Sequence, residues 1–320
     1  MIEKELVMPT YGEQNYNLHG IIWMPDETPV QKVIHVVHGM TEHIGRYRQF
    51  AETMTKNGIA VAGFDLRGHG KNAGDPVCAS FAYGETADAS DYGWYRSLED
   101  IKRQKIEIRM HCPEAKYYLM GFSLGSFLVR DYMNEIPMNK IDGIILMGTG
   151  HQPPIITNTM KAIAHIEIGR AEPHGTTETI RKLAFDTYNK KFEPRRTMFD
   201  WLCSDEKARY EYIDDPLLRK DIAADLFYEM MACMSRVNRI STYSGENDLS
   251  TTPILLMSGE NDAVGDMGKS IKTIARQMER AGLTNVTTEI IPGARHDILH
   301  EYESGAAGYA TNFIKEWLGN

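Results

Sequence analysis

The stretch Tyr118–Phe127, YLMGFSLGSF, places one serine between two glycines directly after an apolar run. Ser123 is the centre of a G-x-S-x-G pattern that Gly121 and Gly125 complete. Glycine removes the side chains that would clash where a chain turns sharply from a strand into a helix. The pattern therefore predicts a nucleophilic serine on such a turn, provided that a strand precedes it and a helix follows.

The sequence around Ser123 alternates between short apolar runs and amphipathic segments. Short continuous apolar strands that alternate with amphipathic helices indicate a mostly parallel sheet covered by helices on both faces. The run before Ser123 is therefore predicted to be a strand and the segment after it a helix, as the serine turn requires. The predicted strands are 33–40, 59–70, 116–123 and 141–150, and the predicted helices are 46–58, 94–113 and 124–136.

After about residue 150 the pattern changes, because helical segments follow one another without a strand between them. Strand-like runs return at 252–262 and 285–297, and an amphipathic helix closes the chain. We predict an α/β core formed by residues 1–150 and 244–320, with a helical cap formed by residues 151–243 inserted between two late strands. Such a cap lies above the carboxyl ends of the parallel strands, where these sheets bind ligands, so it is placed to act as a lid.

Composition excludes several classes of protein. The chain has 320 residues and a net charge of −9, so nucleic acid is not expected as a partner, because no basic face is available to hold phosphates. The N-terminus is charged where a signal peptide is apolar, and no run of about 18 apolar residues occurs. Four scattered cysteines without a C-x-x-C pair indicate reduced thiols and a cytoplasmic location. We expect no metal site and no cofactor. We make no prediction of the oligomeric state.

A serine hydroxyl needs a neighbouring base, and the base needs an orienting carboxylate. On a fold of this kind the three follow in the order Ser, Asp, His. Of the eleven histidines, only His296 and His300 come after the last predicted strands. His296 lies in the turn PGARHD and is the preferred base, whereas His300 lies one helical turn further, in what reads as the final helix.

The carboxylate is expected in the stretch LLMSGENDAVGD, which follows the cap and contains Glu260, Asp262 and Asp266. Asp262 lies in the turn directly after the predicted strand and is preferred as the residue that orients the histidine. Asp266 lies one turn further and is expected to cap the helix predicted at 268–280.

An oxyanion needs two backbone N–H groups that point to where negative charge develops. The N–H of Leu124, directly after the serine, is expected to be one, and the N–H of Met40, in the turn after an early strand, the other. Gly39 allows the backbone to turn inward at that point. His38 and His69 precede the serine in the chain, so we interpret both as residues that brace loops by hydrogen bonding.

Five motifs, in this order, resemble the monoacylglycerol lipase/lysophospholipase branch of the α/β-hydrolases, which is grouped with the serine aminopeptidase type. They are HGMTEHIGRY, FDLRGHGKNAG, GFSLGS, GENDAVGD and PGARHDILHE. The resemblance covers nearly the whole chain and implies the α/β-hydrolase fold, a triad of Ser123, Asp262 and His296, and oxyanion donors at Met40 and Leu124. One departure is the stretch 75–93, which is longer than this family leads us to expect and would reshape one rim of the site.

The cap stretch FYEMMACMSRV places four apolar side chains close together on a predicted helix: Phe227, Met230, Met231 and Met234. They suit the packed core of the cap, and they equally suit a flexible groove for an acyl chain, because methionine adapts to varied shapes. The two roles are compatible, since a lid helix packs on one side and faces the cleft on the other.

We therefore expect a serine hydrolase that cleaves a small-molecule carboxylic ester, such as a monoacylglycerol, a lysophospholipid or a short or medium acyl ester, through an acyl-enzyme. For such a substrate we also expect transient contact between the cap and a membrane or micelle. Two alternatives remain open at this stage. One is an aminopeptidase of the proline-iminopeptidase type, and the other is a non-catalytic binding protein on the same fold.

Overall fold

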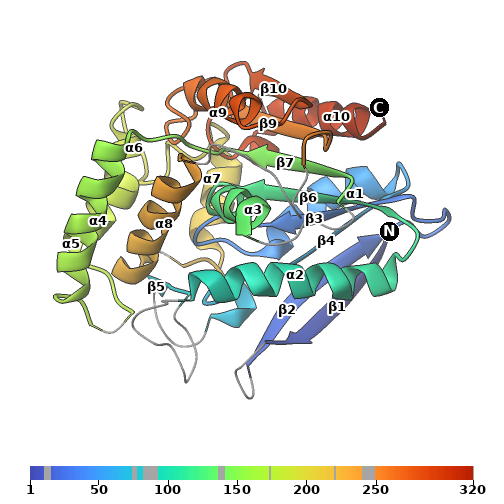
Figure 1. The fold of residues 1–320 in the computed structure, drawn as a ribbon, viewed down its shortest axis with the longest axis horizontal. Helices are drawn as coiled ribbons and strands as arrows, with labels where there is room; N and C mark the ends of the chain where they lie inside the picture. The colour runs from blue at the N-terminus through green and yellow to red at the C-terminus, as the bar shows by residue number, and fades with distance from the viewer. Residues whose placement is uncertain are drawn as a thin grey trace.

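The computed structural model describes residues 1–10, 16–73, 78–81, 93–135, 141–172, 174–219, 221–239 and 249–319. Figure 1 shows one central sheet with helices on both of its faces and a group of helices at one end of it. The stretch 75–93, expected to reshape one rim of the site, falls largely outside the described residues.

The central sheet has eight strands in the order β1-β2-β4-β3-β6-β7-β9-β10. The six strands from β4 to β10 run parallel, as the alternating pattern predicts, whereas β1 and β2 pair antiparallel at one edge. β1 and β2 are absent from the predicted elements, because β1 exposes most of its residues and β2 alternates buried with partly exposed ones, so neither forms a continuous apolar run. The strands are β1 Ile2–Pro9, β2 Asn17–Met24, β3 Lys32–Val37, β4 Ile59–Phe64, β6 Lys116–Phe122, β7 Gly143–Met147, β9 Ile254–Gly259 and β10 Val286–Ile291.

Each face of the sheet carries its own apolar core. One core packs side chains of α2, α3 and α9 on the sheet, and it extends into the group of helices that follows β7. The other core packs α1 and α10 on the opposite face. Burial on both faces explains why the central strands are continuous apolar runs. The flanking helices are α1 Arg48–Thr55, α2 Trp94–His111, α3 Leu124–Glu135, α9 Lys269–Arg280 and α10 Ala306–Gly319.

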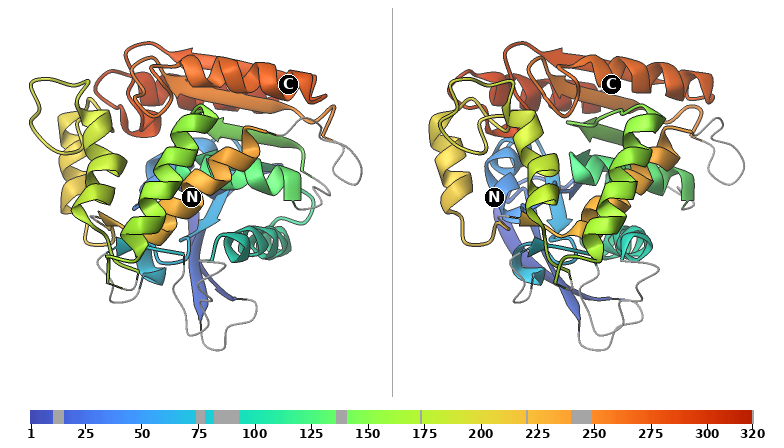
Figure 2. Two further views of the ribbon diagram at one scale, coloured as in Figure 1. Left: turned by 60° about the vertical axis from the view of Figure 1, so that its left-hand side comes forward. Right: turned by 90° about the vertical axis from the view of Figure 1, so that its left-hand side faces the viewer.

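The helices between β7 and β9 form most of the predicted cap. The long helix α4 packs along α8, and α8 in turn packs on α3, which begins at the predicted serine turn. Figure 2 shows α4 and α8 side by side, and Figure 1 shows both at the end of the molecule away from α10. The division of the chain into a core and a cap at 151–243 stays a prediction. The elements are α4 Pro154–Ile168, α5 Glu178–Arg181, the π-helical turn Lys182–Asp186, α6 Thr187–Asn189, α7 Glu206–Asp214 and α8 Ala224–Val237.

The expectation of a cap without strands is wrong in one place. Residues Asp221–Ile222 form a short strand, β8, which pairs in parallel with β5, Cys78–Ala79, in a separate two-stranded sheet. A two-residue strand is too short to produce a recognisable pattern in the sequence. This pairing ties the start of α8 to the loop that follows β4.

Candidate active site

Ser123 lies between the end of β6 and the start of α3, the strand–turn–helix context that the sequence predicts. Its φ angle is +50°, a region that residues other than glycine rarely adopt. The two glycines around it are required by close backbone contacts. A Cβ on Gly121 would lie 2.5 Å from the carbonyl oxygen of Gly125, and a Cβ on Gly125 would lie 2.0 Å from that of Val37. The strained turn therefore depends on the absence of both side chains.

Ser123, His296 and Asp262, which lie far apart in the sequence, meet at the carboxyl ends of the strands. The Oγ atom of Ser123 lies 2.9 Å from Nε2 of His296, and Nδ1 of the same ring lies 2.8 Å from Oδ1 of Asp262. His296 and Asp262 are fully buried. The structure thus brings together the three residues that the sequence singles out, in the geometry of a nucleophile, a base and an orienting carboxylate.

Both members behind the serine are held in place. The carboxylate of Asp262 also accepts a hydrogen bond from the backbone N–H of Val264 at 2.9 Å. The imidazole of His296 lies between two aromatic rings, with centroid distances of 5.0 Å to Phe122 and 5.2 Å to Trp201. These contacts leave the ring little freedom to rotate away from the serine.

The alternative base and acid are engaged elsewhere. His300 lies in a short 3-10 turn, Ile298–His300, and not in the final helix as the sequence suggested. Its Nδ1 pairs with Asp297 at 2.7 Å and its Nε2 with the carbonyl oxygen of Arg46 at 3.1 Å. A turn stabilised by these contacts ends before α10 begins, which explains the difference.

Asp266 does not cap α9 with its side chain, contrary to expectation. The N-cap of α9 is Gly268, and Asp266 has a φ angle of +48° and a half-exposed carboxylate 3.9 Å from Lys269. The third candidate, Glu260, accepts a hydrogen bond from the N–H of Gly293 at 2.9 Å, at the surface.

The two predicted oxyanion donors flank the serine. Leu124 is the first residue of α3, and the first N–H groups of a helix have no carbonyl partner within it. Met40 lines the same hollow as Ser123. His38 braces the Met40 loop as predicted, because its Nδ1 donates to the carbonyl of Gly39 at 2.7 Å and its Nε2 accepts from Leu66 at 2.8 Å. Burial lowers the pKa of His38 to about 3, so the ring is neutral.

His69 is braced in a similar way. Its Nδ1 donates to the carbonyl of Arg67 at 2.7 Å, and burial, together with the nearby His38, lowers the pKa of its ring to about 3. The prediction of a loop-bracing role is therefore supported for both histidines.

A narrow hollow of about 30 Å³ lies above the serine. That volume holds about one water molecule, so an acyl chain enters only when the wall moves. The four apolar residues predicted from the cap all line it, and each is at the same time buried in the cap core. The lining residues are Met40, Ser123, Phe127, Gln152, Ala184, Tyr188, Trp201, Phe227, Met230, Met231, Met234 and Val264.

Tyr188 and Trp201 are lining residues that the sequence did not single out. Both come from the cap, and their rings pack on each other with centroids 5.3 Å apart. Burial, with a contribution from Asp262, raises the pKa of Tyr188 to about 12, so its hydroxyl stays protonated. Tyr188 lies in the short helix α6 and Trp201 in a turn, and neither belongs to a long periodic pattern, so only the tertiary structure brings these two to the serine.

In the described part of the chain, no group of three or more His, Cys, Asp or Glu side chains is placed to hold a metal ion. No helix among the described residues has the length and apolar character needed to cross a membrane.

Comparison with known proteins places these features in a family. A monoglyceride lipase homolog of monkeypox virus is 24% identical over 302 residues, which cover 93% of this chain and 92% of that protein. An uncharacterised abhydrolase domain-containing protein of Dictyostelium discoideum is 40% identical over 297 residues, which cover 92% of this chain and 27% of that protein.

Among solved structures, a thermostable carboxyl esterase from Bacillus coagulans in complex with glycerol superposes with a TM-score of 0.81. It is 23% identical, and the match covers 99% of both chains, so the two share a fold. The family model described as serine aminopeptidase, S33, matches residues 28–303. The chain therefore belongs to the serine aminopeptidase S33 family and has the α/β-hydrolase fold.

Proposed function

We propose that this protein is a serine hydrolase that cleaves carboxylic esters through an acyl-enzyme. The observation that carries the proposal is the hydrogen-bonded series Ser123–His296–Asp262, with distances of 2.9 and 2.8 Å, at the floor of an apolar hollow. His296 contacts a serine on a strained turn through one ring nitrogen and a buried carboxylate through the other. This arrangement is the one that activates a serine nucleophile.

In the proposed reaction, Ser123 Oγ attacks the ester carbonyl carbon while His296 Nε2 takes the serine proton. Asp262 holds the ring and stabilises the imidazolium that forms. The N–H groups of Met40 and Leu124 stabilise the oxyanion of the tetrahedral intermediate. Its collapse breaks the bond to the alcohol, which leaves with the proton that His296 returns.

Deacylation repeats these steps with water in place of serine. His296 removes a proton from the water as its oxygen attacks the acyl carbon, and the same proton then returns to Ser123 Oγ as the acid leaves. No group other than the three side chains and the two backbone donors is needed for the complete cycle.

The lining of the hollow supports an acyl ester as the substrate class. Most of its side chains are apolar, and each acyl CH₂ buried against them contributes about 0.8 kcal/mol. Monoacylglycerols, lysophospholipids and short or medium acyl esters fit this chemistry, and the names of the viral monoglyceride lipase homolog and of the bacterial carboxyl esterase agree with it.

The wall that must move for entry is the cap, which we propose to make transient contact with a membrane or micelle. Helix α4 exposes Ile155, Ile156 and Ile166, with relative exposures of 74%, 40% and 55%. Single exposed apolar residues are common, but three on one helix beside α8, which lines the hollow, suit contact with a membrane or micelle that holds the lipid ester.

A fluorophosphonate probe and a hydrolysis panel on the purified protein test the proposal. Labelling is expected at Ser123 and is expected to be absent in Ser123→Ala, which keeps the fold. Unlabelled wild-type protein would indicate a non-catalytic binding protein. Labelled protein that hydrolyses prolyl amides but no ester would indicate the aminopeptidase.

A further inference from the structure

The loop after β3, residues 38–43, carries the proposed oxyanion donor Met40 and is held on both sides of it. On one side, the N–H of Gly39 donates to Oε1 of Glu42 at 2.6 Å. On the other side, Thr41 has a φ angle of +67°, which is a strained conformation for a β-branched residue. Such a conformation persists only where surrounding contacts enforce it.

The contacts that enforce the conformation of Thr41 come from the cap. The hydroxyl of Tyr212, on α7, lies 2.7 Å from Oγ1 of Thr41, and the N–H of Arg219 donates to the carbonyl of Thr41 at 3.0 Å. Because Thr41 Oγ1 donates its proton to the Met40 carbonyl, the Tyr212 hydroxyl is the donor to Thr41. Burial raises the pKa of Tyr212 to about 12, so this donor keeps its proton over the working pH range.

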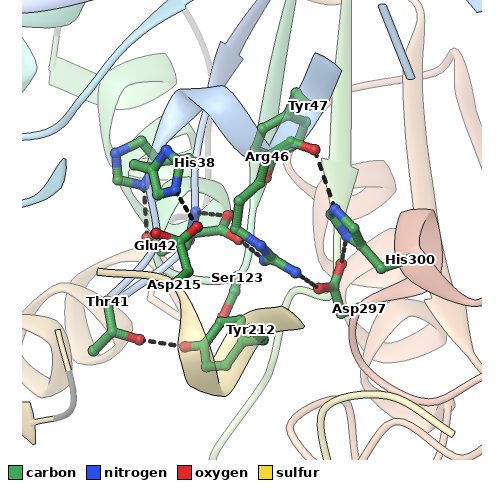
Figure 3. Close-up of polar contacts among 12 residues, drawn as sticks. His38, Thr41, Glu42, Arg46, Tyr47, Ser123, Tyr212, Asp215, Asp297 and His300 are labelled. Carbon is green, nitrogen blue, oxygen red and sulfur yellow. Dashed lines mark hydrogen bonds and ion pairs between the residues drawn. The ribbon is translucent and has the colours of Figure 1, made fainter. Parts of the chain in front are cut away.

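The opposite side of the loop is tied to the core. The guanidinium of Arg46 pairs with Glu42 and, at 2.8 Å, with Asp297, the residue after His296 (Figure 3). Burial opposes ionisation of Asp297, yet the charges of His300 and Arg46 outweigh it and hold the pKa of that carboxyl below its usual range. Glu42, Arg46 and Asp297 are therefore a fixed, charged link between the oxyanion loop and the loop of the base.

The contacts through Arg46 and those through Tyr212 connect the oxyanion loop to different parts of the molecule. The link through Arg46 joins two core loops, one after β3 and one after β10, at the carboxyl ends of the parallel strands. The link through Tyr212 joins the oxyanion loop to the cap, which is the part that must move to admit an acyl chain. Tyr212 also lies under Arg46, with its ring centroid 4.8 Å from the guanidinium carbon, so α7 touches both links.

We propose that Tyr212 is a positioning residue, which sets the direction of the Met40 N–H through its hydrogen bond to Thr41. The cap then acts on the chemical step as well as on entry, because α7 must be seated on the loop for the oxyanion donor to be in place. The proposal rests on the proposed function, since it assigns a role within the same oxyanion site. Misplacement of a catalytic group by about 1 Å costs up to about a hundredfold in rate.

The first test is Tyr212→Phe, compared with Tyr210→Phe on the exposed side of the same helix. Tyr212→Phe is expected to lower kcat about tenfold, less than the loss of a whole oxyanion donor, while KM stays within about twofold. Fluorophosphonate labelling is expected to slow by the same factor, because its phosphoryl oxygen occupies the same site. Tyr210→Phe is expected to behave as wild type in both assays.

A second test uses Thr41, which keeps its shape but loses its hydroxyl in Thr41→Val. Thr41→Val is expected to lower kcat at least as much as Tyr212→Phe, because it also removes the hydrogen bond to the Met40 carbonyl. Thr41→Ser, which keeps the hydroxyl, is expected to stay close to wild type. The double variant Thr41→Val/Tyr212→Phe is expected to be no slower than Thr41→Val alone, since Thr41→Val already removes the hydrogen bond that Tyr212→Phe removes. Thermal melting of each variant shows that the rates refer to folded protein.

The outcomes separate this proposal from the proposed function. Wild-type labelling at Ser123 with equal rates for Tyr212→Phe and Tyr210→Phe overturns the positioning role and leaves the hydrolase intact. Multiplicative losses in the double variant overturn it as well, because they mean that the two side chains act independently. Labelling without ester turnover counts against the ester substrate only, and the labelling rates then decide the role of Tyr212.

Discussion

The indole of Trp201 and the imidazole of His296 lie with their ring centroids 5.2 Å apart and their planes tilted by 39°. Trp201 lies in the predicted cap and His296 in a loop of the predicted core, so the proposed base is packed against a residue of the predicted cap. The next cap residue, Leu202, accepts a hydrogen bond from the N–H of Asp297 at 2.7 Å. The cap is thus in direct contact with the base loop as well as with the oxyanion loop.

The first prediction concerns the triad. Ser123→Ala and His296→Ala are each expected to lower kcat by about a thousandfold or more, because each removes a member of one hydrogen-bonded unit. Asp262→Asn is expected to lower kcat about ten-thousandfold, since an amide favours the wrong tautomer of His296. Steady-state rates on a soluble ester, with folding checked by circular dichroism, measure all three.

Two control variants test the assignment within the triad. His300→Gln and Asp266→Asn are expected to retain most activity, because the side chains contact Asp297 and Lys269 rather than the serine or the base. A larger loss in His300→Gln than in His296→Ala would move the base to His300. Equal losses in the two aspartate variants would mean that the carboxylate is shared or misassigned.

The second prediction contrasts two glycines. Gly125→Ala is expected to destabilise the protein by about 1–3 kcal/mol or more, because its Cβ would meet the backbone carbonyl oxygens of Val37, at the end of β3, and His38, at 2.0 and 2.6 Å. Gly308→Ala, in α10 where a Cβ meets nothing within 4 Å, is expected to stabilise it by about 0.5–1 kcal/mol. Urea unfolding measures both, and a neutral result for Gly125→Ala would contradict the geometry of the turn.

These glycines also show why the site was readable from the sequence. Gly121, Gly125 and the order Ser123, Asp262, His296 are local or positional signals, because steric clashes and chain order require them wherever this turn occurs. The contacts of Tyr212 with Thr41 and of Arg46 with Asp297 carry no such signal. They join residues 171 and 251 positions apart through single side chains, and nothing in the local pattern distinguishes these residues from other polar residues.

Like the site, the fold has elements that the sequence predicts and elements that it does not. Central strands buried on both faces produce continuous apolar runs, and these runs predict them. β1 exposes most of its residues and β2 alternates buried with partly exposed ones, so neither forms such a run. The pairing of β5 with β8 was missed because two residues are too few for a period. His296 lies in the turn where the sequence predicts it, whereas the 3-10 turn at His300 depends on tertiary contacts with Asp297 and Arg46.

The third prediction concerns acid stability. Burial lowers the pKa values of His35, His38 and His69 to about 3, against about 6.5 in an unfolded chain. Between these values the unfolded state binds more protons, so stability is lost as the pH falls from about 6.5 towards 3. Each histidine contributes a slope of up to about 1.4 kcal/mol per pH unit.

Urea unfolding at several pH values between 7 and 5 tests this slope, in wild type and two variants. His35→Gln removes one buried imidazole and is expected to reduce the slope by about one third. His111→Gln, at the partly exposed end of α2, is expected to leave it unchanged. A slope that is the same in all three proteins would show that buried histidines do not govern acid unfolding.

The last prediction concerns substrate class, which the cap must decide because the triad and oxyanion donors permit ester and amide cleavage alike. An exopeptidase has to bind a free α-amino group with a carboxylate beside the serine, and a buried unpaired carboxylate is costly. Among the described residues, no acidic side chain lines the hollow. The residues of α8 that line the hollow lie between Phe227 and Met234. The one carboxylate in this stretch, Glu229, accepts a hydrogen bond from the backbone N–H of Trp94 at 3.1 Å.

We therefore expect kcat/KM on short to medium acyl esters or monoacylglycerols to exceed that on prolyl or other aminoacyl amides by at least about a hundredfold, or about 2.7 kcal/mol. Met231→Glu, which places a carboxylate in the hollow, is expected to lower ester turnover, whereas Met231→Leu keeps the apolar wall and most of the activity. Comparable rates on proline amides, abolished when cap carboxylates are neutralised, would reverse the assignment. The apolar wall would then be the packed core of the cap alone, and the amine site would lie elsewhere along the cleft.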